Sequence, residues 1–194
     1  MFIFDFTEKM ITLKLLCLFQ LTSRQVVDAY IERQREVQPI INAITEDRWL
    51  LARAEAELVD RALEELQKGA ESMPSADSNK PFRTATLATD WPLLGIPISV
   101  KECFAVAGLY WTGGIKSRAE RRVTATVDDE ADTVRRLKGA GAIVLCHTNV
   151  PELAMWTESS NVVYGRTLNP YDTRRAPGGS SGGEAALVCI SNYQ

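Results

Sequence analysis

Residues 95–101 read GIPISVK, a short apolar run that begins with glycine and ends with lysine. A continuous apolar run of this length predicts a strand that is buried on both faces. A second such run, AIVLC, occupies residues 142–146, and the pattern between the two predicts an amphipathic helix over residues 129–140. A strand, a helix and a strand in this order indicate a parallel α/β unit, in which ligands gather at the carboxyl ends of the strands. We therefore expect Lys101 and His147 at one edge of the sheet.

Two further helices are predicted upstream of this unit. A capping-box sequence, TSRQ, precedes apolar residues at helical spacing and predicts a helix over residues 23–37, which Pro39 ends. An amphipathic pattern predicts a second helix over residues 47–68, with Gly69 as its stop. Residues 70–92 have no periodicity, and we expect a long exposed loop there.

The composition is that of one globular domain, because 45% of the 194 residues are apolar and 24% are charged. The formal net charge is -3, so no broad basic field exists and we expect no nucleic-acid partner. The four cysteines lie far apart and the chain has a single histidine, so the ligands for a structural zinc ion are lacking. We expect no metal site and favour a reducing, intracellular location.

The N-terminal residues are apolar, but they are too few to span a membrane. Residues 10–21 read MITLKLLCLFQL, which falls short of the roughly 18 residues that a spanning helix needs, and Lys14 interrupts them. A strand or helix packed on the body and a peripheral membrane contact both fit this segment. We treat residues 1–21 as a variable or peripheral N-terminal segment.

Residues 177–184, PGGSSGGE, are the least ordinary stretch of the chain. Glycines at this density leave backbone amides uncovered, and the apolar residues 185–188 predict a helix whose N-terminus favours negative charge. A phosphate loop would need a lysine that is absent here, and a nucleophile elbow would need a histidine after the serine, whereas His147 precedes it. A flexible linker would not adjoin an apolar helix. The remaining interpretation pairs Lys101, as a base, with a serine of the loop.

The motifs of the chain resemble those of the amidase signature family of serine hydrolases. The resemblance is carried by GIPISVKE at residues 95–102, AGAIVLCHTNVPE at 140–152 and NVVYGRTLNPYDTRRAPGGSSGGE at 161–184. It covers about residues 22–188, and residues 152–172 are most similar to the fatty-acid amide hydrolase 2 type, less so to the corresponding protein of glutamyl-tRNA amidotransferase. It implies an α/β fold, namely the N-terminal portion of a mixed sheet flanked by helices, and makes residues 22–194 a partial amidase domain.

The resemblance also implies a site. Lys101 would act as a neutral base, and Ser180, placed after a cis peptide bond, would relay a proton between the lysine and the nucleophile. The other expected site residues belong to the loop or to the acyl-chain channel of the family: Gly178, Gly179, Ser181, Met155 and Trp156. For Met155 and Trp156, packing in the core is the alternative to a substrate-lining role. The family chemistry implies a small-molecule amide substrate and no metal or organic cofactor.

The acylated serine of the family has no counterpart among these residues. In the family it lies after the helix in a second Gly-Gly-Ser turn, whereas here no glycine follows Gly183 and Ser191 is the only later serine. We therefore expect an amidase-type fragment with little or no amide hydrolysis of its own. The alternatives are a protein like that of the glutamyl-tRNA amidotransferase and a non-catalytic partner of a full-length homologue. A sheet that lacks its other strands would expose apolar edges, so we expect self-association.

Overall fold

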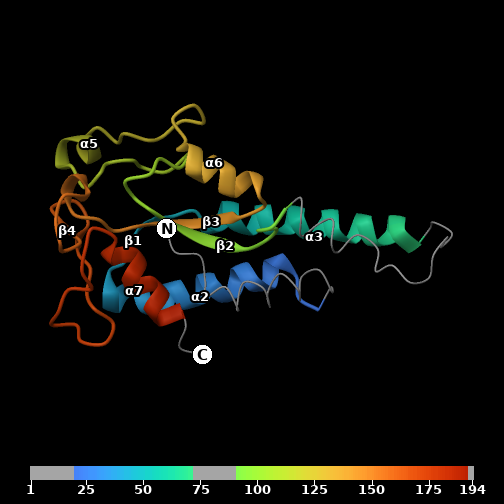
Figure 1. The fold of residues 1–194 in the computed structure, drawn as a ribbon, viewed down its shortest axis with the longest axis horizontal. Helices are drawn as coiled ribbons and strands as arrows, with labels where there is room; N and C mark the ends of the chain where they lie inside the picture. Colours follow the sequence, from blue (N-terminus) through green and yellow to red (C-terminus); the bar gives the residue numbers. More distant parts are fainter. Residues whose placement is uncertain (1–19, 72–90, 192–194) are drawn as a thin grey trace.

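The computed structural model of the protein describes residues 20–71 and 91–191. A three-stranded sheet lies at the centre of this part of the chain (Figure 1). Its strands are β1 (Ile44–Asp47), β3 (Ile143–Thr148) and β2 (Pro97–Lys101), in this spatial order. β2 runs parallel to β3, which confirms the predicted parallel unit, and β1 runs antiparallel to β3.

Helices cover both faces of the sheet, so the architecture is α/β as predicted. α2 (Ser23–Ile41), α3 (Trp49–Glu71) and α7 (Gly182–Ser191) pack on one face, around a core that includes Leu145 of β3. α6 (Asp132–Gly139) lies on the other face, opposite α2 and α7 in Figure 1, and covers a second core that includes residues of β2. The shorter elements are α5 (Lys116–Glu120), the 3-10 turn η1 (Glu152–Ala154) and the hairpin of β4 (Ser160–Asn161) and β5 (Gly165–Arg166).

The predicted end of α2 at Pro39 is wrong, because the helix continues to Ile41 with the proline inside it. The packing of Ile41, which is fully buried in the core, outweighs the hydrogen bond that a proline cannot donate. The helix ends where Asn42 adopts a left-handed conformation, with φ of 47°, and donates its backbone N–H to the carbonyl of Gln38. The predicted capping box at Thr22 is present.

The predicted helix over residues 47–68 begins and ends later, as α3. Its start moves because residues 44–47 form the edge strand β1, which was not predicted from the sequence. Its end moves because the helix passes through Gly69, so the glycine is not the stop. Of the predicted loop over residues 70–92, the first two residues are helical and residues 72–90 lie outside the described part of the chain, as do residues 1–19.

The other boundaries are adjusted by local hydrogen bonds. α6 starts after Asp129, because that carboxylate accepts from the backbone and the hydroxyl of Thr126 in a turn that precedes the helix. β3 extends to Thr148 and therefore contains His147, and all six of its residues are buried. The helix predicted after the Gly-rich loop is α7, which starts at Gly182. None of the helices in the described ranges combines the length and the apolar composition needed to cross a bilayer.

Candidate active site

The side chains of Lys101 and Ser180 meet, as expected. Lys101 ends β2, and its Nζ donates a hydrogen bond of 2.7 Å to the Oγ of Ser180, which lies 79 residues further along the chain. The Gly-rich loop brings Ser180 to this place, directly before α7. The carboxyl end of a parallel strand and the approach to a helix N-terminus are thus combined in one partly buried polar site.

The loop before α7 approaches another backbone segment closely. Gly178 has φ of +99°, and the peptide bond between Gly179 and Ser180 is cis, as the family resemblance implied. A Cβ atom on Gly179 would lie 2.8 Å from the carbonyl oxygen of Trp156 and 2.7 Å from the carbonyl carbon of Thr157. Only glycine fits at this position, because both neighbours are backbone atoms that no side-chain rotation can move.

Hydrogen bonds from buried residues hold the rest of the loop. The Oγ of Ser159, a fully buried serine, accepts from the backbone N–H of Gly182 at 2.8 Å and donates to the carbonyl of Ser180 at 3.3 Å. The N–H of Gly183 donates to the carbonyl of Asn149, just after β3, at 3.2 Å. Ser181, which is partly buried, has its carbonyl bonded by the N–H of Ala185 in the first turn of α7.

Glu184 is a further member of this site for which no role was predicted from the sequence. Its side chain is fully buried, and its Oε1 accepts from the hydroxyl of Thr148 at 2.8 Å while its Oε2 accepts from the hydroxyl of Ser99 at 2.7 Å. The available sequence signal was an acidic residue in the first turn of a predicted helix. Its two partners depend on strand register, which the sequence did not define.

Met155 and Trp156 lie in the segment that crosses the Gly-rich loop. Their side chains are 79% and 70% exposed, so the expectation of core packing is wrong for both. The chain reaches them through two consecutive left-handed residues, Leu153 and Ala154, with φ of 52° and 56°. The backbone N–H of Leu153 donates to the carbonyl of Gly113 at 2.7 Å and so ties this segment to a neighbouring turn.

The family model described as amidase matches residues 70–193, which include both partners of the 2.7 Å hydrogen bond. This chain belongs to the amidase family. Fatty-acid amide hydrolase 2-B of Danio rerio is 44% identical over 169 residues, which are 87% of this amidase chain and 29% of the relative. Fatty-acid amide hydrolase 2 of Homo sapiens is 42% identical over 166 residues, or 86% of the amidase chain and 28% of the relative. The amidase chain thus spans less than a third of the length of these relatives.

Solved amidase structures share its fold. A structure described as fatty acid amide hydrolase matches 94% of the amidase chain with a TM-score of 0.76 and 26% identity, over 28% of its own length. The structure of 6-aminohexanoate cyclic dimer hydrolase matches 94% with a TM-score of 0.74 and 26% identity, over 32% of its length. The described part of the amidase is therefore part of a larger amidase fold, as the sequence predicted.

His147 of the amidase does not join Lys101, so the expectation that both lie at one edge of the site is wrong. His147 pairs in register with Val100, whose side chain points to the opposite face of β2 from that of Lys101. The ring is fully buried, its Nδ1 lies 3.2 Å from the carbonyl oxygen of Tyr110, and burial lowers its pKa from 6.5 to about 4. His147 is therefore neutral at pH 7 and is a core residue.

Glu102 of the amidase is also buried on the face away from the Lys101–Ser180 pair. Its Oε1 accepts from the backbone and hydroxyl of Thr112 and from the N–H of Gly113, the residue whose carbonyl holds Leu153. Burial raises the pKa of this carboxyl group. Glu102 therefore orders the turn that supports the Met155 segment. Among the described residues, no group of His, Cys, Asp and Glu side chains is arranged to hold a metal ion.

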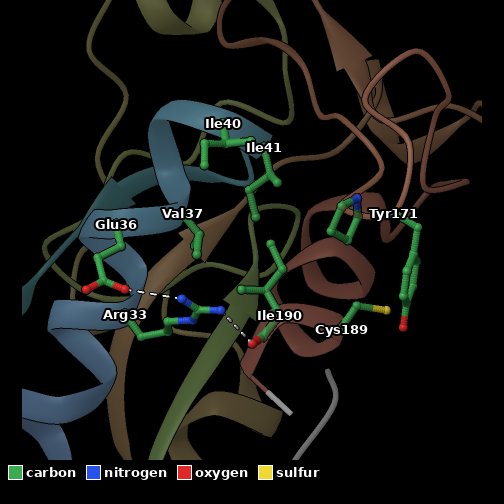
Figure 2. A pocket seen from close by; sticks show the side chains of 9 residues that line it. Arg33, Glu36, Val37, Ile40, Ile41, Tyr171, Cys189 and Ile190 are labelled. Atoms are coloured by element: carbon green, nitrogen blue, oxygen red, sulfur yellow. Dashed lines mark hydrogen bonds and ion pairs between the residues drawn. The ribbon is translucent and has the colours of Figure 1, made fainter. Parts of the chain in front are cut away.

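A cavity of about 630 Å³ lies elsewhere on the amidase, between α2 and α7 (Figure 2). Its walls are mainly apolar and include Val37, Ile41 and Ile190. Arg33 lies at its margin and donates to the carbonyl of Ile190 at 3.4 Å, as the dashed line in Figure 2 shows. None of the residues of the Lys101–Ser180 site lines this cavity.

Proposed function

We propose that this amidase chain carries the base and the proton relay of an amide-hydrolysing site, with Lys101 as the base and Ser180 as the relay. The observation that carries the proposal is the 2.7 Å hydrogen bond between their side chains. Membership of the amidase family and the cis peptide bond before Ser180 support it. A hydroxyl that contacts an amine at this distance can give its proton to the amine and receive one from a third group.

In the proposed step, the hydroxyl of a serine nucleophile gives its proton to the Oγ of Ser180 as Ser180 gives its own proton to the neutral Nζ of Lys101. The nucleophile oxygen bonds to the amide carbonyl carbon. The proton then returns along the same path to the nitrogen of the leaving amine as the carbon–nitrogen bond breaks, which leaves an acyl-enzyme for water to hydrolyse.

The nucleophile of this step has no counterpart in the 194 residues, since no glycine follows Gly183 and no second Gly-Gly-Ser turn is present. We therefore propose that these residues alone hydrolyse amides negligibly. A fluorophosphonate probe tests this directly: we expect no stoichiometric labelling. Labelling of Ser180 or Ser181 accompanied by turnover would contradict it.

The substrate class that we propose is a fatty-acid amide. Met155 and Trp156 present exposed apolar side chains beside the Gly-rich loop, where an acyl chain would gain from leaving water. The two quoted relatives at 44% and 42% identity are named fatty-acid amide hydrolases. In this proposal Gly178, Gly179 and Ser181 shape the part of the site that faces the amide group.

A chimera tests the site and the substrate class together. Residues 22–188 replace the matching part of fatty-acid amide hydrolase 2 of Homo sapiens, and release of free fatty acid from a long-chain amide is measured. We expect activity that falls by roughly 10² or more in Lys101→Ala and in Ser180→Ala. Lys116→Ala, at a lysine whose side chain is 72% exposed, is the matched control and should have no effect. Equal activity in Lys101→Ala and in the parent chimera would refute the proposal.

A second, non-catalytic function is favoured by the open edge of the sheet. Within the described residues β2 pairs only with β3, so its other edge is available to a further strand. We propose that the chain associates with itself, or with a full-length homologue, through this edge. Light scattering after gel filtration should show a mass that rises with concentration. A monomer at all concentrations would exclude self-association, and failure to bind the full-length relative would exclude the hetero-complex.

A further inference from the structure

Glu184 has the features of a residue that is kept for its two hydrogen bonds. Its carboxylate is fully buried, and burial of a carboxylate is costly unless hydrogen bonds replace its contacts with water. Both oxygens receive such bonds, from hydroxyl groups at 2.7 Å and 2.8 Å. The carboxylate is therefore fixed in place by two separate strands.

The two donors flank the lysine of the site. Ser99 precedes Lys101 by two residues on β2, so both side chains point to the same face of the sheet. Thr148 is the residue of β3 that pairs in register with Lys101. Glu184 itself follows Ser180 by four residues, within the first turn of α7. The two ends of a short structural ring are thus the Lys101–Ser180 contact and the carboxylate of Glu184.

We propose that Glu184 is a positioning residue that sets the contact between Lys101 and Ser180, by fixing the first turn of α7 to the strand positions beside the lysine. The proposal rests on the proposed function of that pair. The rest of α7 is held independently, because Ala186 and Leu187 are buried in the core and Arg33 donates to the carbonyl of Ile190. Loss of the carboxylate should therefore free the loop while the helix stays in place.

The reactivity of Lys101 reports on this contact in the chain as it exists. The protein is treated with a trace amount of acetic anhydride near neutral pH, and mass spectrometry gives the acetylation rate of Lys101 relative to that of Lys116, which is an exposed internal reference. Ser180→Ala defines the change that follows when the contact is lost, and we expect a change of about threefold or more.

Four variants then test the role of Glu184. Glu184→Ala should produce at least half of the Ser180→Ala change on a logarithmic scale, and Thr148→Val, which removes one of the two hydrogen bonds, an intermediate change. Glu184→Gln should restore the wild-type ratio, because an amide can accept from one hydroxyl and donate to the other. Arg33→Met disturbs the far end of α7 and is the matched control, with no change expected. Thermal unfolding is recorded for every variant.

The outcomes separate the two proposals. If Ser180→Ala leaves the ratio unchanged, the pair itself is not formed in solution, and both the proposed function and the role of Glu184 fail. If Ser180→Ala changes the ratio but Glu184→Ala does not, only the role of Glu184 fails. A change in Glu184→Gln as large as that in Glu184→Ala would also overturn the positioning role. If Glu184→Ala does not fold, the same decision is taken from Thr148→Val, for which a wild-type ratio is the refuting result.

Discussion

Protonation of His147 should make the fold sensitive to mild acid. The ring is fully buried in β3, and burial lowers its pKa from 6.5 to about 4. Between these two values the unfolded chain binds a proton that the folded chain does not, so the free energy of unfolding rises with pH. At about 1.4 kcal/mol for each pH unit, the contribution of His147 lowers this free energy by about 2 kcal/mol at pH 5 and by about 3 kcal/mol at pH 4, relative to pH 7.

Two neighbouring carboxyl groups act in the opposite direction. Burial raises the pKa of Glu46 and of Glu102, so each favours the folded state at low pH and loses that contribution as the pH rises. The measurement is therefore a difference: urea unfolding of the wild type and of His147→Gln, from pH 7 down to pH 4. The carboxyl contributions cancel, and we expect the difference to change by about 3 kcal/mol over this range. A difference that does not vary with pH would refute the burial of a neutral ring.

Three further predictions concern packing and reactivity. Gly183→Ala should destabilise the protein by about 2 kcal/mol or more in urea unfolding, because its Cβ would lie 2.4 Å from the backbone nitrogen of Asn149. Gly139→Ala, at a position with no atom within 4 Å, is its control, and a loss of stability there would argue against the steric explanation. Leu145→Ala should cost about 2–5 kcal/mol in the same assay, since Leu145 is 2% exposed, and a cost below about 1 kcal/mol would contradict its place in the core. Iodoacetamide should label Cys146 only after unfolding, as peptide mapping would show, because burial raises the pKa of its thiol well above the usual value. Labelling of native Cys146 would refute this.

The parts of the fold that the sequence predicted are those with a strong local pattern. The apolar runs that became β2 and β3, and the amphipathic pattern that became α3, follow from burial on two faces or on one. The strand β1 was missed because its four residues, ITED, mix apolar and acidic side chains and pair only at the sheet edge. Pro39 was overestimated as a stop, because its local effect was weighed without the core contact of Ile41.

The candidate site shows a similar division. The meeting of Lys101 with Ser180 was predicted from the resemblance of motifs, since no periodicity brings together residues that lie 79 positions apart. The face occupied by His147 was predicted wrongly, because β3 runs further than its apolar residues indicate and its register with β2 shifts between Ile98 and Ser99. The partners of Glu184 depend on the same register, so only coordinates could identify them.

The exposure of Met155 and Trp156 has a consequence for how this surface can diversify. Side chains that are 79% and 70% exposed contribute little to the folded state, so their replacement by other residues changes the recognised molecule while the scaffold below stays intact. The glycine beneath them has no such freedom, because a Cβ on Gly179 would meet backbone atoms at less than 3 Å, at 2.7 Å and 2.8 Å. New specificities are therefore most accessible by mutation in the outer layer of residues, above an inner layer that tolerates almost no variation.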